Sequence, residues 1–204
     1  MRGLRHRFEG EICAFGTASG YRVVIGRWPV SPFGPIADVM VEEPGGWRVL
    51  FAPTEESAAY IAATYAFDDV RVVPVEAERE PNRLTVTAGD LRADVVTGAR
   101  DALGQLLRRV PRRLAAAPVW AALVDPVTRV ALPGVRTRGT AGGGRREWYG
   151  AHDRHRLEAV TASFGGRSLG PMADVDPPVR FGFGSAPRRP SIVEVTTTIE
   201  LPPA

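Results

Sequence analysis

Short runs of β-branched and aromatic residues, each bounded by glycine or proline, recur along the first half of the chain. Three of these runs are YRVVIGRW at residues 21–28, IADVMVE at 36–42 and WRVLFA at 47–52. The EEPGG between the last two is typical of a turn. We therefore expect neighbouring antiparallel strands in this part of the chain.

Strict alternation of apolar and polar residues marks a further strand near residue 200. In SIVEVTTTIEL, residues 191–201, the side chains of Val193, Val195 and Ile199 fall on one face, and those of Glu194 and Glu200 on the other. A strand with one apolar face packs that face on a core and exposes the other. We expect a half-exposed strand of an antiparallel sheet.

Two segments change to helical spacing. Thr54 follows Pro53 and can cap a short helix over residues 55–66. Residues 99–124 carry apolar side chains at helical spacing and are interrupted by Pro111, which predicts a helical pair. The fold class is therefore α+β: a mainly antiparallel, strongly curved or barrel-like sheet with one short helix and a helical pair packed on it. We expect a single domain over residues 1–204.

The composition excludes several chemistries. The chain has 204 residues and 44% hydrophobic residues, enough for one substantial core. All 26 basic residues are arginine, because the sequence contains no lysine. A lysine Schiff base, a phosphate-loop lysine and a lysine general base are therefore excluded.

The single cysteine, Cys13, cannot form an intramolecular disulfide, and its apolar surroundings favour a buried, inert thiol. The basic N-terminal residues are not followed by the apolar segment of a signal peptide. The longest apolar run, residues 114–124, is too short to span a bilayer and contains Pro118. We expect a cytoplasmic protein without a membrane partner.

Charge is distributed unevenly along the chain. Residues 38–80 carry ten acids and three arginines, whereas residues 95–156 carry twelve arginines and four acids. Folding can neutralise these segments through arginine–carboxylate contacts within the domain. The alternative is a basic face that receives an anionic ligand.

The decapeptide EWYGAHDRHR, residues 147–156, concentrates the residue types that a site requires. His152, His155 and Asp153 are candidate acid–base residues, since a carboxylate can orient an imidazole that titrates near neutral pH. The segment around it supplies candidate ligand-binding residues, namely anion contacts from Arg136, Arg138, Arg145 and Arg146 and an apolar wall from Trp148 and Tyr149. The alternative is a solvated β-hairpin end without a function.

A metal site is not expected, because His152 and His155 would point to opposite faces of a strand unless a turn at Gly150 brought them together. We predict no cofactor. Nucleic acid is not expected as a partner, because no known binding motif is present. Oligomeric state stays open.

We predict that the protein binds a small anionic organic molecule in a pocket of the curved sheet, with conversion of that molecule as a further hypothesis. The alternative is a non-enzymatic interaction or scaffold protein with a basic face for an acidic partner. Whether the protein is an enzyme stays open.

Three segments carry a resemblance to uncharacterised actinobacterial proteins of unknown function: SPFGPIADVMVE, GGGRREWYGAHD and VDPPVRFGFGSAPRRPS. The resemblance covers most of the chain and implies no activity. The expected architecture is also similar to the acetoacetate decarboxylase-like fold. The absence of lysine excludes the Schiff-base decarboxylation of that family.

Overall fold

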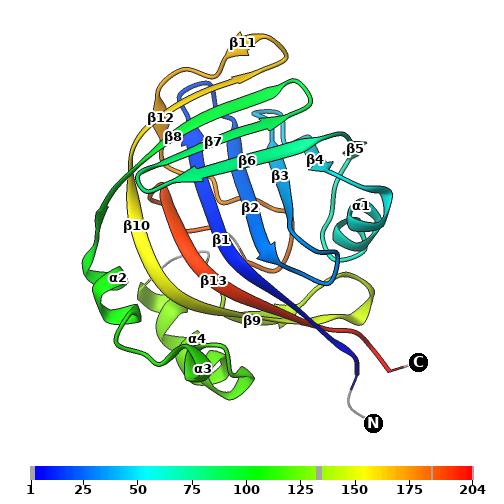
Figure 1. The fold of residues 1–204 in the computed structure, drawn as a ribbon, viewed down its shortest axis with the longest axis vertical. Coiled ribbons are helices and arrows are strands. Elements are labelled where there is room, and N and C mark those ends of the chain that lie inside the picture. Colours follow the sequence, from blue (N-terminus) through cyan, green and yellow to red (C-terminus); the bar gives the residue numbers. More distant parts are fainter. Residues whose placement is uncertain (1–2, 132–134, 185, 204) are drawn as a thin grey trace.

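One curved sheet of 13 strands organises the computed structural model, which describes residues 3–131, 135–184 and 186–203 (Figure 1). Its main path is β5-β4-β3-β2-β1-β13-β10-β8-β7-β6. Strands β4 and β5 pair in parallel, and the other neighbours on this path pair antiparallel. The strands are β1 (Arg5–Thr17), β2 (Arg22–Val30), β3 (Ile36–Glu42), β4 (Arg48–Ala52), β5 (Asp69–Val72), β6 (Val75–Glu80), β7 (Arg83–Ala88), β8 (Leu91–Arg100), β9 (Arg138–Thr140), β10 (Arg146–Phe164), β11 (Arg167–Ser168), β12 (Met172–Ala173) and β13 (Ser191–Glu200).

The curl of the sheet brings β6–β8 over β1–β4, as Figure 1 shows. The main core fills the space between these two layers, with Phe15, Ile25 and Phe51 from one layer and Leu84 and Leu91 from the other, all fully buried. Cys13 belongs to this core and is also fully buried, as predicted. The expected α+β class with a mainly antiparallel, strongly curved sheet is confirmed.

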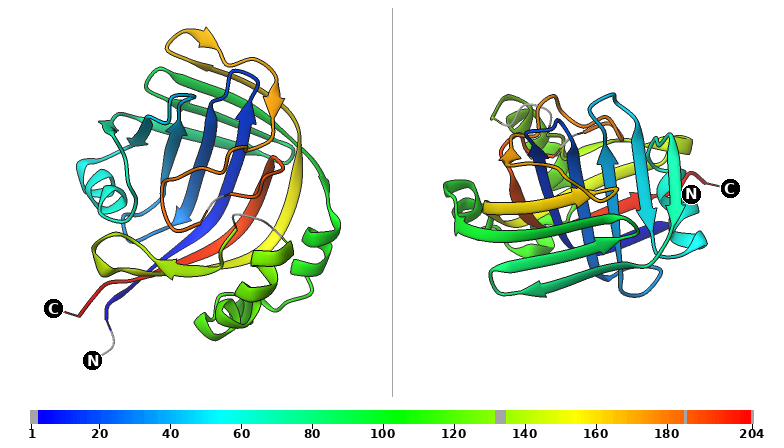
Figure 2. Two further views of the ribbon diagram at one scale, coloured as in Figure 1. Left: turned by 180° about the vertical axis from the view of Figure 1, so that it is seen from behind. Right: turned by 90° about the horizontal axis from the view of Figure 1, so that it is seen from above.

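The other face of β1–β4 packs against helix α1 (Glu55–Ala62) and against the chain that follows β12. In the left view of Figure 2, which looks from behind, this chain crosses the face of the sheet that is turned to the viewer, with α1 at its side. Leu50 of β4 contacts Ala58 and Ile61 of α1, and Ala14 of β1 contacts Val179 and Phe181. We call this face of the sheet the α1 face.

Helix α1 begins as predicted, at Thr54. The Thr54 Oγ1 accepts a hydrogen bond from the Ser57 amide at 3.2 Å, and the Ser57 Oγ accepts one from the Thr54 amide at 3.2 Å. This reciprocal capping box satisfies two amides that a helix start leaves unpaired. The helix ends at Ala62, before the predicted residue 66.

Three helices occupy the region of the predicted helical pair. They are α2 (Ala102–Leu107), α3 (Arg112–Ala115) and α4 (Pro118–Ala131), and a 3-10 helix η1 follows at Gly142–Gly144. Pro111 immediately precedes α3 and Pro118 is the first residue of α4, because the start of a helix leaves amides unpaired and so accepts a residue without an amide hydrogen. Within the described residues, no helix combines the length and the apolar character needed to cross a membrane.

Strand β13 differs from its prediction. It lies between β1 and β10 in the middle of the sheet, and both of its faces are largely buried. Its alternating sequence indicated one exposed face, but Thr196 and Glu200 are also buried, at 4% and 5% exposure. On the face that was expected to be exposed, Thr196 shares a hydrogen bond with His152 of β10, and Glu200 pairs with Arg5 of β1.

Candidate functional site

The decapeptide 147–156 lies inside the long strand β10, and its first two residues pair with β9 in a short hairpin. The hairpin turn precedes it, at residues 141–145 between β9 and β10. Gly150, the expected turn, is a strand residue that contacts helix α3: a Cβ there would lie 2.5 Å from the Ala115 carbonyl oxygen. No turn therefore brings His152 and His155 together.

Alternation along β10 divides the predicted site residues between two faces. Glu147 and Tyr149 point to the α1 face, where both are within reach of Tyr65. Trp148 and Arg146 point to the opposite face, where the Arg146 guanidinium lies 5.4 Å from the Trp148 ring centre and pairs with Glu200. Residues that are neighbours in the sequence therefore lie in different environments on the two faces of β10.

The four predicted anion-binding arginines do not converge. Arg136 lies 3.5 Å from Asp125, and Arg146 pairs with Glu200. Arg138 is exposed on β9. Arg145 reaches the α1 face, where its Nη1 donates to the Tyr60 carbonyl oxygen at 2.8 Å.

The predicted acid–base residues lie near β8 and the helices α2 and α3. Both Asp153 oxygens accept hydrogen bonds from Arg100, at 2.7 and 2.8 Å. His155 Nε2 lies 3.6 Å from the same carboxylate, and its Nδ1 lies 3.1 Å from the Gly98 carbonyl oxygen. His152 is 5% exposed and contacts Thr196 instead, so the two histidines have separate environments.

Glu147 is a buried ionisable group on the α1 face. Its side chain is fully buried, and its Oε1 accepts a hydrogen bond from the Tyr65 hydroxyl at 2.5 Å. The Tyr149 hydroxyl lies 3.0 Å from that of Tyr65. Burial raises the pKa of Glu147 to about 7, although the two tyrosine hydroxyls act in the other direction. Glu147 can therefore hold or release a proton near neutral pH.

Buried polar atoms without a partner gather around Glu147. Strand pairing aligns one residue from each of β1, β13 and β10 in a row across the sheet: His6, Ile199 and Glu147. The next row on the same face consists of Phe8, Thr197 and Tyr149. Tyr60 of α1 lies over this region, with its ring centre 5.3 Å from that of His6. Of the buried side-chain atoms that find no hydrogen-bond partner among the described residues, four belong to this region: His6 Nδ1, Tyr60 OH, Glu147 Oε2 and Thr197 Oγ1.

Aromatic side chains form the wall beside this polar group. Phe8 lies 5.7 Å from Trp28 and 5.8 Å from Tyr60 between ring centres, and Phe33 lies 5.2 Å from Tyr60. The Arg145 guanidinium lies over the Tyr60 ring, at 4.5 Å from its centre. A cation, an apolar wall and an ionisable acid thus share one region.

A second buried acid, Asp38, lies on the same face. The Trp28 Nε1 donates to its Oδ1 at 2.8 Å, and burial raises its pKa to about 7. Gly26 makes room for this pair, since a Cβ there would lie 2.5 Å from the Trp28 nitrogen and 2.6 Å from the Asp38 oxygen. An acid inside the apolar run IADVMVE was the sequence signal for this group.

The sequence did not indicate His6, Tyr60 or Tyr65 as site residues. They come from β1 and from the α1 region, and a strand pairing of residues almost 200 positions apart brings His6 near Glu147. We name the group formed by His6, Tyr60, Tyr65, Arg145, Glu147, Tyr149 and Thr197 the Glu147 cluster.

No protein-family model and no curated protein matches this chain. A crystal structure of acetoacetate decarboxylase from Legionella pneumophila subsp. pneumophila str. Philadelphia 1 is similar, with a TM-score of 0.47 and 11% sequence identity over 98% of this chain and 86% of that chain. This agrees with the architectural resemblance expected from the sequence. At this level of similarity it carries no argument about activity.

Proposed function

We propose that the Glu147 cluster binds a small organic carboxylate and that Glu147 exchanges a proton with it. The observation that carries the proposal is the fully buried Glu147 carboxyl, with one oxygen held by Tyr65 and the other without a partner. A buried acid with a pKa near 7 is suited to general acid–base chemistry. A predicted acid–base role for His152, His155 and Asp153 remains a separate hypothesis.

The unpaired polar atoms support a ligand at this place. A buried donor or acceptor without a partner costs about 1–3 kcal/mol, and four such atoms lie on one patch. Proteins retain groups of this kind where another molecule supplies the missing hydrogen bonds. A bound molecule with several oxygens would offset the cost.

The surroundings define the chemical class of the ligand. Arg145 provides a permanent positive charge for a carboxylate, and the rings of Phe8, Trp28 and Phe33 provide an apolar wall for a short carbon body. The Tyr60 ring contacts both the Arg145 guanidinium and the His6 ring. We propose that Tyr60 and Arg145 move aside when the ligand enters.

Melting temperatures measured with acetate, butyrate and benzoate, at constant ionic strength against chloride, test the binding. We expect butyrate and benzoate to raise the melting temperature more than acetate, because they bury more apolar surface. Arg145→Ala should abolish the shift. Arg146→Ala is the matched control, because its side chain lies on the opposite face of β10. Equal shifts in both variants, or none in the unaltered protein, would reject the proposed site.

Proton transfer is tested separately with a keto acid. We expect the protein to accelerate exchange of the pyruvate methyl hydrogens in D₂O, followed by ¹H NMR, and Glu147→Gln to remove the acceleration. If the hydrogens exchange no faster than in buffer alone, the proposed acid–base role of Glu147 is rejected. The proposed binding of a carboxylate is then judged by the melting experiment alone.

A further inference from the structure

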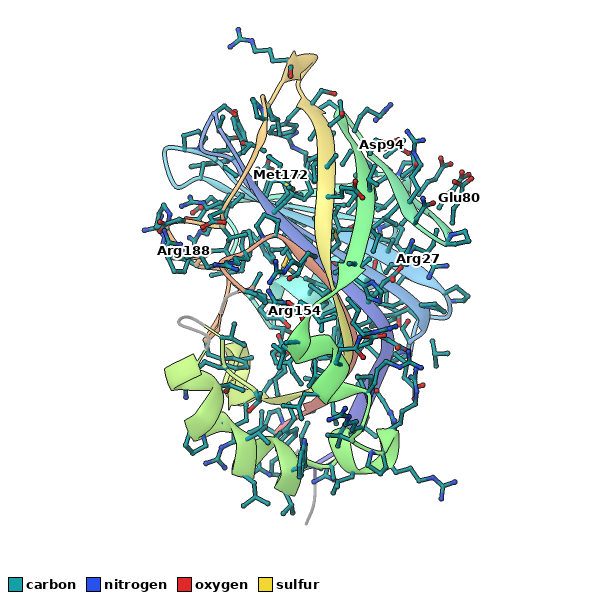
Figure 3. The ribbon with its side chains drawn as sticks, turned by 90° about the vertical axis from the view of Figure 1, so that its left-hand side faces the viewer. Arg27, Glu80, Asp94, Arg154, Met172 and Arg188 are labelled. Carbon is teal, nitrogen blue, oxygen red and sulfur yellow. The ribbon has the colours of Figure 1, made fainter. Side chains whose placement is uncertain are left out.

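A pocket of about 380 Å³ lies on the face of β10 and β13 opposite the Glu147 cluster. The segment that joins helices α2 and α3 and the first residue of α3 contribute to its lining. Figure 3 shows these helices beside β10, on which Arg154 is labelled. The pocket is lined by Arg100, Arg108, Val110, Arg112, His152, Asp153 and Glu194, and we call it the Arg108 pocket.

Two glycines allow the helices to approach β10 closely. Gly104 of α2 lies so near β10 that a Cβ there would be 2.2 Å from the Arg154 carbonyl oxygen. Gly150 of β10 lies so near α3 that a Cβ there would be 2.5 Å from the Ala115 carbonyl oxygen. Asp101 caps α2 through the Gly104 amide at 2.9 Å and also pairs with the buried Arg154 at 3.4 Å. These contacts fix the position of the helices relative to the floor of the pocket.

The lining carries an excess of positive charge. Asp153 pairs with Arg100, and Glu194 pairs with Arg112, so both carboxylates that would repel an anion are neutralised. Arg108 is exposed at the end of α2 and has no ion pair with a described residue. One guanidinium therefore stays uncompensated, and Arg100 and Arg112 supply further N–H groups nearby.

His152 forms the buried part of the lining. Its Nε2 lies 2.8 Å from the Thr196 Oγ1, and its Nδ1 has no partner among the described residues. Burial and the nearby Arg112 lower its pKa, which favours the neutral form of the ring. When the Thr196 hydroxyl donates to Nε2, the Nδ1 carries the proton and is a free donor.

We propose that the Arg108 pocket binds a tetrahedral oxyanion, phosphate or a phosphoryl group, through Arg108, Arg112 and the Nδ1–H of His152. Guanidinium groups hydrogen-bond such oxygens through their N–H forks. Val110 is the one apolar side chain in the lining described, so the pocket lacks the apolar wall that an organic body would require. This site is separate from the proposed carboxylate site and does not depend on it.

Calorimetric titration with inorganic phosphate at constant ionic strength tests the proposal. Arg108→Ala should weaken binding by about tenfold or more, because it removes the uncompensated charge. Arg109→Ala is the matched control, since Arg109 is the adjacent exposed arginine and does not line the pocket. Equal affinities in the three proteins, or no binding to the unaltered one, would overturn the proposal.

Two further measurements locate the anion and its source. Phosphate should shift the ¹⁵N resonance of His152 Nδ1, and an unchanged resonance would overturn the placement against this ring. Tighter binding of glycerol phosphate than of inorganic phosphate would support a phosphoryl group on an organic molecule, and the reverse would support free phosphate. Arg145→Ala should retain phosphate binding, which separates this result from that of the carboxylate experiment.

Discussion

At the scale of single residues, the Glu147 proton is coupled to folding. Its pKa is about 7 in the folded chain and 4.5 without the fold. Between these values the unfolded chain has released the proton while the folded chain retains it. The contribution of Glu147 to stability is therefore full below pH 4.5 and is lost as the pH rises to 7, by about 3 kcal/mol in total.

Glu147→Gln should remove this dependence, because an amide does not titrate. Urea unfolding between pH 4 and 8 gives the free energy of unfolding of the variant and of the unaltered protein. The difference between the two isolates Glu147, because the contributions of Asp38 and the other acids are the same in both. Glu158→Gln, an exposed acid on the same strand, is the control and should follow the unaltered protein. Parallel curves for all three proteins would contradict the raised pKa.

At the scale of elements, helix α1 depends on a cap that the sequence predicted. Thr54→Ala removes the acceptor of the Ser57 amide and should lower the free energy of unfolding by about 1 kcal/mol. Thr54→Ser keeps the hydroxyl and should retain most of the stability. Denaturant curves of the two variants compare them directly. A Ser variant as unstable as the Ala variant would mean that the lost methyl group matters more than the cap.

Local sequence patterns predicted the bounds of some strands but not the orientation of every side chain. Residues 36–42 form β3 with the predicted bounds, because a local β-branched run between turns determines a strand. The decapeptide of β10 was harder to interpret, because composition shows which residues gather but not which face each one takes. Once β10 is known to be a strand, alternation places Glu147 with Tyr149 and Trp148 with Arg146.

The partners of the candidate site could not be predicted from local patterns. Tyr65 meets Glu147 across 82 residues of sequence, and Arg5 meets Glu200 across 195. These contacts depend on strand order, which alternation does not encode.

At the scale of the whole molecule, the uneven charge of the sequence is compensated in part within the fold. Glu42 in the acidic segment is contacted by Arg22 and Arg180, which lie outside that segment. Arg112 and Arg146 in the basic segment pair with Glu194 and Glu200 of β13. Strand β13 thus supplies acids to the arginine-rich part of the chain.

The sheet as a whole should fail to form without β13. A chain that stops at Pro190 lacks the strand joining β1 to β10, and we expect it to lose near-ultraviolet circular dichroism and resistance to protease. A chain that stops at Leu201 keeps β13 and should resemble the full chain. A protease-resistant fragment 1–190 with native circular dichroism would show that β1 and β10 do not need their shared neighbour.

The central place of β13 also has a consequence for folding during translation. Strand β1 is synthesised long before its partner β13, and until β13 is available β1 has an unpaired backbone edge open to other chains. The ribosome must complete residue 200 before the middle of the sheet can close. Folding therefore waits for the pairing of distant segments, and the growing chain is open to aggregation or chaperone binding through most of its synthesis.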